Sequence, residues 1–385
     1  MSITELIQYA RFIISKLLHP NIIHINNENG SNKFVLLSYI TNPFRISPNN
    51  SRFKHHSNKW ECRKIADIWL KHGYNIDVID WNNTHFIPKR DYEIFIDIHS
   101  NMERLTPFLK NSKKILHITG AHWKFQNAAE MKRLSDLRDR KGFTLKPRRQ
   151  VTPCNGIEYA DCATILGNKF TQDTYAFSKK TLYPIHLSTA ILFPHYEKDF
   201  TKIKKNYLWL GSTGMIHKGL DLVLEAFNQL PDYNLIVCGP VDKEKDFENA
   251  YFEELYRSPN IKTLGFVALD SKDFLDTIQN TVGLIYPSCS EGQAGSVISC
   301  MHAGLIPIIS YESGVDTGDF GCTLSENTVD AIIEAVISLS LKSTEELKIM
   351  SYKSWSYARE YHTQEMFSKD YKAFVENILN KMETS

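Results

Sequence analysis

The sequence predicts an α/β protein made of two doubly wound halves in tandem, which face each other across a central cleft. Short apolar runs alternate with helical segments, as in βαβ units that build a parallel sheet. This pattern restarts after a charged link at residues 195–206, and no strand follows the last long helical segment. Open α/β sheets bind ligands at the carboxyl ends of their strands, so we expect a ligand site between the halves.

The first half opens with a helical segment and continues with alternating strands and helices. Apolar residues at helical spacing predict a helix at 4–18, and similar patterns predict helices at 58–72 and 125–141, ended by Gly73 and Gly142. A loop rich in Pro, Asn and Ser follows the first strand. The predicted strands are the short apolar runs at 33–40, 75–80, 92–98, 114–120 and 162–166.

The second half repeats this order. Helices are expected at 220–230 and 296–303, where Pro231 and Gly304 end them, and a single long helix is expected at 355–378. The predicted strands lie at 207–211, 234–238, 261–264, 282–286 and 305–309.

Length and composition exclude several classes of protein. The 385 residues suggest two domains, and 42% hydrophobic with 23% charged residues is typical of an ordinary globular chain. No apolar run approaches the ~18 residues of a membrane span, and charged residues interrupt the N-terminal stretch where a secretory signal would lie. The seven cysteines include no Cys-x-x-Cys pair, which argues against a disulfide framework or zinc ribbon and favours the reducing cytoplasm.

The net charge of +1 hides a strong asymmetry. Residues 1–200 carry 29 Lys and Arg against 18 Asp and Glu, a net +11, whereas residues 201–385 carry a net −10. Two explanations stay open: the basic half meets an anionic partner or surface, or a two-lobed protein distributes its charges unevenly.

The segment from Gly211 to Asp221 follows a predicted strand and opens a helix. Its glycines, among them Gly214, let the backbone approach a phosphate, and the helix start favours negative charge. Lys218 adds a point charge suited to a diphosphate. The alternative is a strand–helix turn whose Gly and Asp only satisfy the backbone. The order of residues is not that of a P-loop.

The segment 287–310 leads from a strand through an acidic residue and a Gly-rich turn into a helix and another strand. Gly295 and Ser296 would offer free N–H groups at the helix start, a second anion site. Glu291 is a good acceptor for sugar hydroxyls; alternatively it only complements the helix dipole, worth ~0.3–1 kcal/mol.

Together these two segments resemble the donor-binding domain of GT-B glycosyltransferases, in the large retaining group 1 (family 4 type) that includes sucrose synthases and bacterial mannosyltransferases. The family has a Gly-Arg…Lys-Gly segment and then Glu-x7-Glu before a Gly-x-Pro-x-Ile strand. The likeness is strong from about residue 205 to 315 and weaker elsewhere. The matching positions in this chain are Gly211, Lys218, Gly219, Asp221, Glu291, Gly304, Pro307 and Ser310.

Two positions depart from the family pattern. Ser212 stands where the family has an Arg, so one diphosphate charge is missing. Ser299 stands where a second Glu would hold the donor ribose, and a hydroxyl binds a ribose less strongly than a carboxylate. Glu312, just past the next strand, would compensate if it faces the ribose, although a solvated loop acid is the plainer interpretation.

The resemblance implies two Rossmann-like domains, residues 1–200 on the acceptor side and 201–359 on the nucleotide-sugar side, with 360–385 crossing back to the first domain. It also implies that Glu291 orients the donor sugar while Lys218 and the helix start neutralise the leaving diphosphate. The nucleotide base is expected beside strand ends that offer backbone groups, at Gly239 and at Gly265 and Val267.

The first half matches the family less well. The Gly-Gly loop that the family has after its first strand is absent, so the acceptor side is built differently. The family often has a His near the reacting sugar at the end of the fourth strand. His122 is the candidate, with His117 and His99 as rivals, although a His at a strand end more often serves as a structural hydrogen-bonding group.

A basic run follows His122, from Lys132 to Arg149. It is either a solvated face or a contact for a phosphorylated or lipid-linked acceptor. With the amphipathic stretch 4–18 it suggests peripheral binding to a membrane surface. Nucleic acid is not expected, because the run comes with no nucleic-acid motif and the whole-chain pI is 7.6.

We therefore expect a cytoplasmic, metal-independent enzyme near the inner face of the membrane. It would move a sugar from a nucleotide-diphosphate sugar to a hydroxyl of a glycan or lipid-linked acceptor, with retention of configuration. No cofactor is expected. Cell-surface polysaccharide synthesis is the expected setting. Because Ser212 and Ser299 weaken the donor motifs, a catalytically inactive nucleotide-sugar-binding or scaffold protein is the alternative. Metal-dependent GT-A enzymes and dehydrogenases are disfavoured, since the Asp-x-Asp and Gly-x-Gly-x-x-Gly patterns are not where those classes need them.

Overall fold

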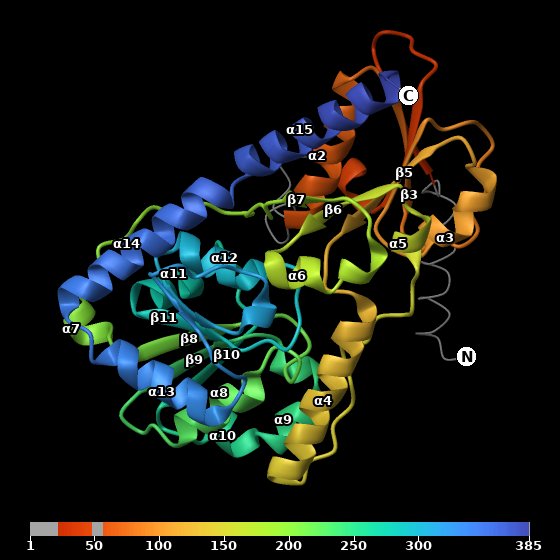
Figure 1. The fold of residues 1–385 in the computed structure, drawn as a ribbon. Helices are drawn as coiled ribbons and strands as arrows, with labels where there is room; N and C mark the ends of the chain where they lie inside the picture. The colour runs from red at the N-terminus through yellow and green to blue at the C-terminus, as the bar shows by residue number, and fades with distance from the viewer. Residues whose placement is uncertain (1–21, 48–56, 385) are drawn as a thin grey trace, which may run out of the picture.

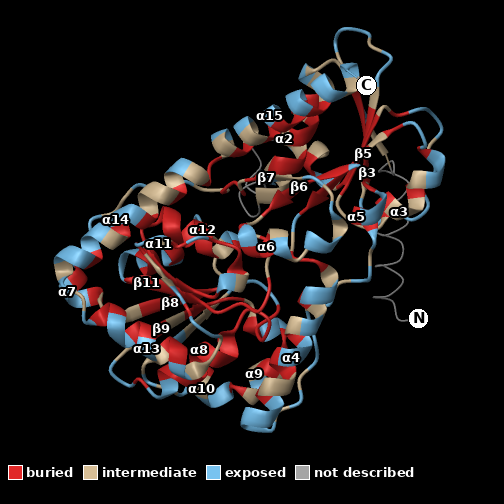
Figure 2. Ribbon diagram, viewed as in Figure 1, coloured by how far each residue is buried: buried red, intermediate tan, exposed pale blue. Residues whose placement is uncertain are grey.

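The computed structural model describes residues 22–47 and 57–384, which form two mainly parallel sheets with helices packed against them (Figure 1). The predicted α/β class and the two doubly wound halves are confirmed. The helix expected at 4–18 and part of the loop after the first strand lie outside the described residues. Buried residues concentrate in the two sheets and on the inner faces of the helices (Figure 2). One hydrophobic cluster runs through both halves, and each half has a further cluster on the other face of its sheet.

The first sheet has seven strands in the order β1-β3-β2-β4-β5-β6-β7. All neighbours are parallel except β1, which pairs antiparallel with β3 at one edge. The sequence did not reveal β1 and β7, because each is a four-residue edge strand that is only partly buried and so lacks a continuous apolar run. The strands are Ile22–Ile25, Phe34–Tyr39, Asn75–Asp80, Ile94–Asp97, Lys113–Ile118, Cys162–Leu166 and Leu182–Ile185.

The second sheet has six parallel strands in the order β10-β9-β8-β11-β12-β13. This order reverses direction between β8 and β11, and such a switch point is where doubly wound sheets bind ligands. The two-residue β13 escaped prediction because it is too short to show a pattern. The strands are Asn206–Leu210, Asn234–Cys238, Ile261–Gly265, Gly283–Tyr286, Ile306–Ile309 and Cys322–Thr323.

Helices cover both sheets. In the first half α2 turns Ile65, Ala66 and Trp69 into the core, and α4 ends at Gly142, whose positive φ of 74° closes the last turn. The helices of residues 57–340 are α2 Ser57–Lys71, α3 Asn101–Leu105, α4 Trp123–Lys141, α5 Gly156–Tyr159, α6 Lys169–Asp173, α7 Phe200–Ile203, α8 Leu220–Asn228, α9 Lys245–Ala250, α10 Phe252–Tyr256, α11 Lys272–Gln279, α12 Gly295–His302 and α13 Val329–Ser340. Short 3-10 turns lie at Asn42–Phe44, Thr106–Phe108, Ala176–Ser178, Val241–Lys243 and Tyr311–Ser313.

The prediction of a single final helix at 355–378 is wrong. The chain forms α14 (Thr344–Tyr361) and α15 (Gln364–Glu383), with a break at His362. The break arises because the Thr363 side chain accepts a hydrogen bond from the Met366 amide and starts a new helix. Thus α14 packs on α12, and α15 crosses back to the first half, where Phe367 contacts Trp60 of α2 (Figure 1).

Helix α4 is an arm of the first half that lies along the second. It starts just after β5, and Figure 1 shows it running beside α8 and α9. Its Leu134 and Leu137 belong to the hydrophobic core of the second half. We call residues 123–150, which comprise α4 and the segment that returns from it, the strap. We keep residue 200 as the proposed boundary between the domains, with the strap as an excursion of the first.

Candidate functional site

A cavity of about 440 Å³ lies between the two halves. The carboxyl ends of β2 and β4 reach it from the first sheet, and those of β8 and β11 reach it from the second. In both sheets these strands flank the point where the strand order reverses, which is the usual ligand position of doubly wound folds. The predicted site residues that line it are Gly211, Ser212, Lys218, Gly239, Val267, Glu291, Gly295, Ser296 and Ser299.

The turn after β8 carries the first donor motif. Gly211 and Gly239 must be glycines because a Cβ at either position would come within 2.5–2.7 Å of the Trp209 ring beneath them. Glu244 holds the middle of the turn by accepting hydrogen bonds from the Gly214 and Met215 amides. The glycines therefore serve close packing, and the cavity side of the turn is left to Ser212 and Lys218.

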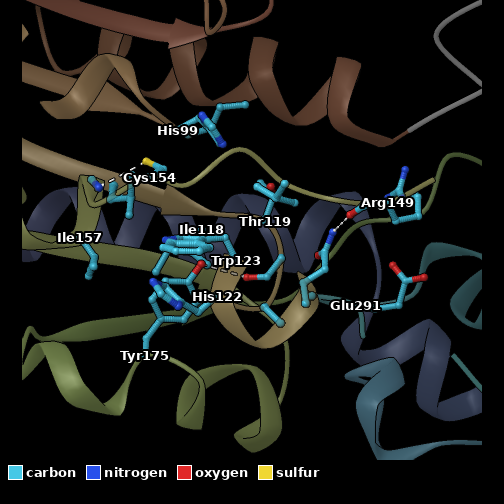
Figure 3. Close-up of a pocket in the computed structure, with 18 residues that line it drawn as sticks. His99, Ile118, Thr119, His122, Trp123, Arg149, Cys154, Ile157, Tyr175 and Glu291 are labelled. Atoms are coloured by element: carbon cyan, nitrogen blue, oxygen red, sulfur yellow. Dashed lines mark hydrogen bonds between the residues drawn. The ribbon is translucent and has the colours of Figure 1, made fainter. Parts of the chain in front are cut away.

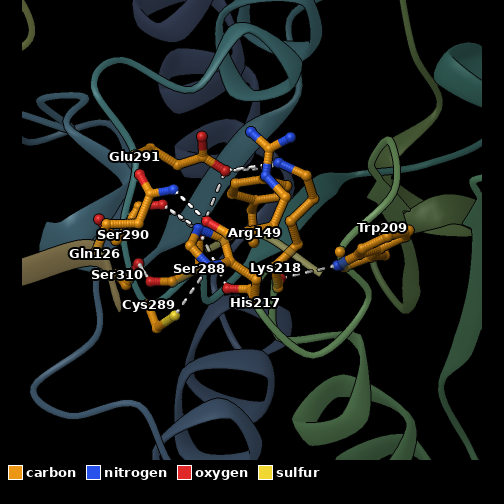
Figure 4. A network of polar contacts seen from close by, with 12 residues as sticks. Gln126, Arg149, Trp209, His217, Lys218, Ser288, Cys289, Ser290, Glu291 and Ser310 are labelled. Atoms are coloured by element: carbon orange, nitrogen blue, oxygen red, sulfur yellow. Dashed lines mark hydrogen bonds and ion pairs between the residues drawn. The ribbon is translucent and has the colours of Figure 1, made fainter. Parts of the chain in front are cut away.

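Lys218, Tyr286 and Glu291 form a buried polar network at the switch point (Figure 4). Lys218 Nζ lies 2.7 Å from Glu291 Oε1 and donates to the Tyr286 hydroxyl at 2.8 Å. That hydroxyl donates in turn to Glu291 Oε1 at 2.8 Å. Lys218 is only 5% exposed, so its charge needs this partner. The network brings the two predicted donor motifs together.

The charges around Glu291 keep it ionised. Burial alone raises the pKa of this carboxyl, but Lys218, His217 and Arg149 outweigh it and hold the pKa at about 2. Burial lowers the pKa of His217, whose Nε2 donates to the Ser290 carbonyl oxygen at 2.5 Å. The site therefore presents a carboxylate that is ionised at neutral pH, 2.7 Å from Lys218 Nζ.

Helix α12 begins at the cavity and brings three predicted residues to it. Gly295 and Ser296 form its first turn, where no side chain caps the helix, and Ser299 follows one turn later. Uncapped N–H groups at a helix start favour an anion. Glu312, the possible substitute for a ribose-binding glutamate, does not line the cavity. It accepts a hydrogen bond from Asn327 instead.

The region expected to hold the base is partly as predicted. Gly239 and Val267 line the cavity, whereas Gly265 does not and instead accepts a hydrogen bond from the Gly239 amide at 2.8 Å. Phe266, which lies between Gly265 and Val267 in the predicted base-binding segment, also lines the cavity, with 70% of its surface exposed.

The first half contributes a wall that the sequence largely failed to indicate. Thr119 follows β5 and touches Gly292, where a Cβ would lie 2.4 Å from the Thr119 carbonyl oxygen. Glu61 on α2 is fully buried, and burial raises its pKa to about 7 against the hydrogen bonds from Ser188. Ser188 donates to Glu61 Oε1 from its amide at 2.9 Å and its hydroxyl at 2.8 Å.

The three histidine candidates lie in different surroundings. His122 lines a smaller pocket of about 240 Å³ that also reaches Glu291, but its ring packs against Trp123, Tyr175 and Phe177 (Figure 3). His99 lines the same pocket. His117 lines neither pocket; its ring bonds Thr164 in the core, where burial lowers its pKa to about 4. Figure 3 places His122 and Glu291 at opposite ends of the smaller pocket.

Most of the basic run binds the second half. Arg133 donates to the Pro287 carbonyl oxygen at 3.0 Å, and Arg140 pairs with Asp221 and Glu225 at 2.9 and 2.7 Å. Lys141 pairs with Glu254 at 3.8 Å, and Arg148 with Asp246 at 2.5 Å. Asp221, which the first motif includes, thus faces the strap. The opposite charges of the two halves meet here.

The sequence missed Arg149 as a site residue. It lines both pockets, and Figure 4 shows it beside Lys218 and Glu291. The donor motifs lie more than 60 residues further along the chain, so no local pattern could have indicated this position.

Comparison with known proteins agrees with this geometry. Residues 204–341 match the family model described as Glycosyl transferases group 1. Sucrose-phosphate synthase from Thermosynechococcus elongatus has a similar structure, with a TM-score of 0.64 and 13% identity over 91% of this chain and 100% of that one. A glycosyltransferase from Rickettsia africae ESF-5 gives a TM-score of 0.59 and 12% identity over 91% and 99% of the two chains. HepE from Anabaena, in complex with UDP and glucose, gives a TM-score of 0.56 and 10% identity over 90% of this chain and 99% of that one. No curated protein matches the chain.

The fold is thus that of the GT-B glycosyltransferases. Over residues 204–341 the chain is similar to the glycosyl transferases group 1 family. Among the residues that the structure describes, no helix is long and apolar enough to cross a membrane, and no cluster of three His, Cys, Asp or Glu side chains has the arrangement of a metal site.

Proposed function

We propose that this chain transfers a sugar from a nucleotide-diphosphate sugar to a hydroxyl group, with retention of configuration. The observation that carries the proposal is the Lys218–Tyr286–Glu291 network, which lies at the switch point of a glycosyl transferases group 1 segment and opens into a cavity shared by both halves. Retention rests on the family resemblance, and the anomeric configuration of the product, read by NMR, tests it.

Each residue of the network has a proposed role. Lys218 moves part of its interaction from Glu291 to the diphosphate, whose negative charge grows as the bond to the sugar breaks. The uncapped start of α12 stabilises the same charge. Glu291, ionised at neutral pH, accepts hydrogen bonds from sugar hydroxyls. His122 borders the smaller pocket and is proposed to position the other face of the sugar. No metal ion is required by this scheme, and unchanged turnover in EDTA checks that point.

The acceptor is proposed to be a glycan or a lipid-linked glycan, used in cell-surface polysaccharide synthesis at the cytoplasmic face of the membrane. The basic first half supports this proposal, since anionic surfaces attract basic segments. The membrane contact rests on the amphipathic stretch 4–18 more than on the basic run, because Arg140, Lys141 and Arg148 pair with carboxylates. Salt-sensitive co-sedimentation with anionic but not neutral liposomes tests it, with the chain lacking residues 1–18 as the control.

A two-stage experiment tests the transferase activity. Thermal shift with a panel of nucleotide sugars identifies the donor, since a ligand at ~100 times its dissociation constant stabilises by ~2.7 kcal/mol. Release of nucleoside diphosphate from that donor is then followed for the wild type and for Glu291→Gln. Turnover that the substitution abolishes supports the proposal. Donor binding without turnover in the wild type favours the inactive nucleotide-sugar-binding protein.

A further inference from the structure

Arg149 lies inside the proposed donor site, where its charge acts on Glu291 although no salt bridge joins it to a carboxylate that the structure describes. Its neighbour Arg148 pairs with Asp246, and Arg133 and Arg140 reach Asp221. Within residues 22–47 and 57–384, by contrast, no carboxylate pairs with Arg149, and its Nε is buried with no hydrogen-bond partner. A buried donor without a partner destabilises the protein, so a ligand that binds it regains free energy.

The surroundings of Arg149 hold it in place. Glu130, itself buried, accepts hydrogen bonds from the amides of Arg148 and Arg149 at 2.9 and 2.8 Å. Gln126 donates to the Arg149 carbonyl oxygen at 2.6 Å. The strap therefore fixes the backbone at this residue and leaves only the side chain free to meet a ligand.

Gly214 makes room for this side chain. A Cβ at Gly214, which has a positive φ of 98°, would lie 2.6 Å from Arg149 Cγ. The stem of Arg149 therefore packs on the first donor motif, and its guanidinium lines the same cavity as Ser212 and Lys218. Gly214 does not line the cavity itself. It acts in the site only by leaving space for the Arg149 side chain.

Ser212 stands at the position where an arginine is expected in the resembling family, and it brings no charge to the cavity wall. We infer that Arg149, delivered from the first half by the strap, binds the diphosphate of the nucleotide donor together with Lys218 and supplies the charge missing at position 212. A guanidinium binds phosphate oxygens in a bidentate manner, which an ammonium group cannot do. The inference rests on the proposed function. It means that residues of both halves form the diphosphate site.

The test measures anion binding apart from catalysis. Inorganic pyrophosphate, UDP and uridine are titrated calorimetrically into the wild type, Arg149→Ala and Arg148→Ala at one fixed ionic strength. Arg148→Ala is the matched control, since it removes an adjacent arginine that pairs with Asp246 outside the cavity. Thermal melting of each variant shows that it is folded. A further variant, Arg149→Ala/Ser212→Arg, returns an arginine to the family position.

Arg149→Ala is expected to weaken pyrophosphate and UDP about tenfold or more, while uridine binding stays unchanged. Arg148→Ala is expected to bind all three ligands as the wild type does. The double variant Arg149→Ala/Ser212→Arg is expected to regain much of the affinity for pyrophosphate and UDP that Arg149→Ala loses. Equal affinity of the wild type and Arg149→Ala for pyrophosphate and UDP would overturn the inference, as would an equal loss in Arg148→Ala.

The turnover of nucleotide sugars separates this inference from the proposed function. If pyrophosphate binding depends on Arg149 but no nucleotide sugar is turned over, the anion site stands and the transferase proposal falls. If Arg149→Ala transfers sugar with the wild-type KM and kcat, the transferase proposal stands and the role of Arg149 falls.

Discussion

The two walls of the central cavity are built in different ways. Two continuous segments, 211–219 and 287–299, each lying between a strand and a helix, form the polar part of the second-half wall, and Gly239 and residues 266–269 complete it. The first-half wall collects residues from α2, from the ends of β2 to β6, from positions 187–190 after β7 and from the strap. The second-half wall can therefore be predicted from sequence patterns, because its polar residues lie close together along the chain. The first-half wall brings together residues that are distant in the sequence, so only the folded structure shows it.

The walls also differ in electrostatics. The second-half wall holds an ion pair, Lys218 with Glu291, in which the pKa of Glu291 is lowered to about 2. The first-half wall holds Glu61, a carboxyl that pairs with no cationic side chain among the residues that the structure describes, and burial raises its pKa to about 7. We interpret the ion pair of the second-half wall as preorganised for a charged donor. Glu61 of the first-half wall is instead a group whose charge changes near neutral pH.

The largest expected effect is that of removing Lys218. Lys218→Met is expected to lower donor turnover at least tenfold, because a charge lost from a diphosphate contact is worth ~2–5 kcal/mol. It is also expected to destabilise the fold by ~3–5 kcal/mol, since the largely buried Glu291 loses its ion-pair partner. Initial rates and urea unfolding measure the two effects.

The double variant Lys218→Met/Glu291→Gln separates these effects. With both charges removed, much of the lost stability should return while turnover stays low. Lys243→Ala serves as the control, since Lys243 is an exposed residue that pairs with Asp242 outside the cavity. If the single variant keeps wild-type turnover at both limiting and saturating donor, Lys218 has no part in the site.

Glu61 predicts a pH dependence of stability. Because its pKa is higher in the folded chain, the folded state binds its proton more tightly, and the contribution of Glu61 to stability falls as pH rises from about 4.5 to about 7. Glu61→Gln removes this loss. The free energy of unfolding of the variant should therefore rise relative to that of the wild type by up to roughly 3 kcal/mol between pH 5 and 8. Urea unfolding at several pH values measures it, with Asp67→Asn on the same helix as the control. A difference between Glu61→Gln and wild type that is constant with pH would contradict the assignment.

Phe266 tests where the base lies. If the exposed ring stacks on a nucleotide base, Phe266→Ala should weaken UDP binding by ~1–3 kcal/mol and leave pyrophosphate binding unchanged. Phe252→Ala removes another exposed ring of the second half that lies outside the cavity. An equal loss for UDP and pyrophosphate would place the effect of Phe266 elsewhere.

Ser299→Glu has the smallest expected effect. Ser299 lines the cavity, whereas Glu312 accepts a hydrogen bond from Asn327 and does not line it. A glutamate there is expected to tighten nucleotide binding severalfold by accepting hydrogen bonds from the ribose. Calorimetric titration of UDP decides it, with Ser299→Gln as the uncharged control. Weaker binding by Ser299→Glu than by Ser299→Gln would show that the carboxylate is unfavourable there.

The sequence was informative where a pattern is local. The strands of both sheets, the turn at Gly211 and the helix start at Gly295 follow from runs of apolar residues and from glycine positions. The edge strands β1, β7 and β13 were missed because they are short and partly exposed, and the break at His362 was missed because one threonine cap decides it. Arg148 and Arg149 are the sharpest case: two identical neighbours in one basic run, of which one binds Asp246 and the other faces the cavity. Only the fold of the strap distinguishes them.

A crystal structure of the chain with a nucleoside diphosphate tests the central claim most directly, because it shows which wall holds the diphosphate. The account predicts diphosphate oxygens within ~3 Å of both Lys218 Nζ and the Arg149 guanidinium, beside the first turn of α12. A diphosphate bound by Lys218 and α12 alone, with Arg149 turned away from it, would contradict a site shared between the two halves.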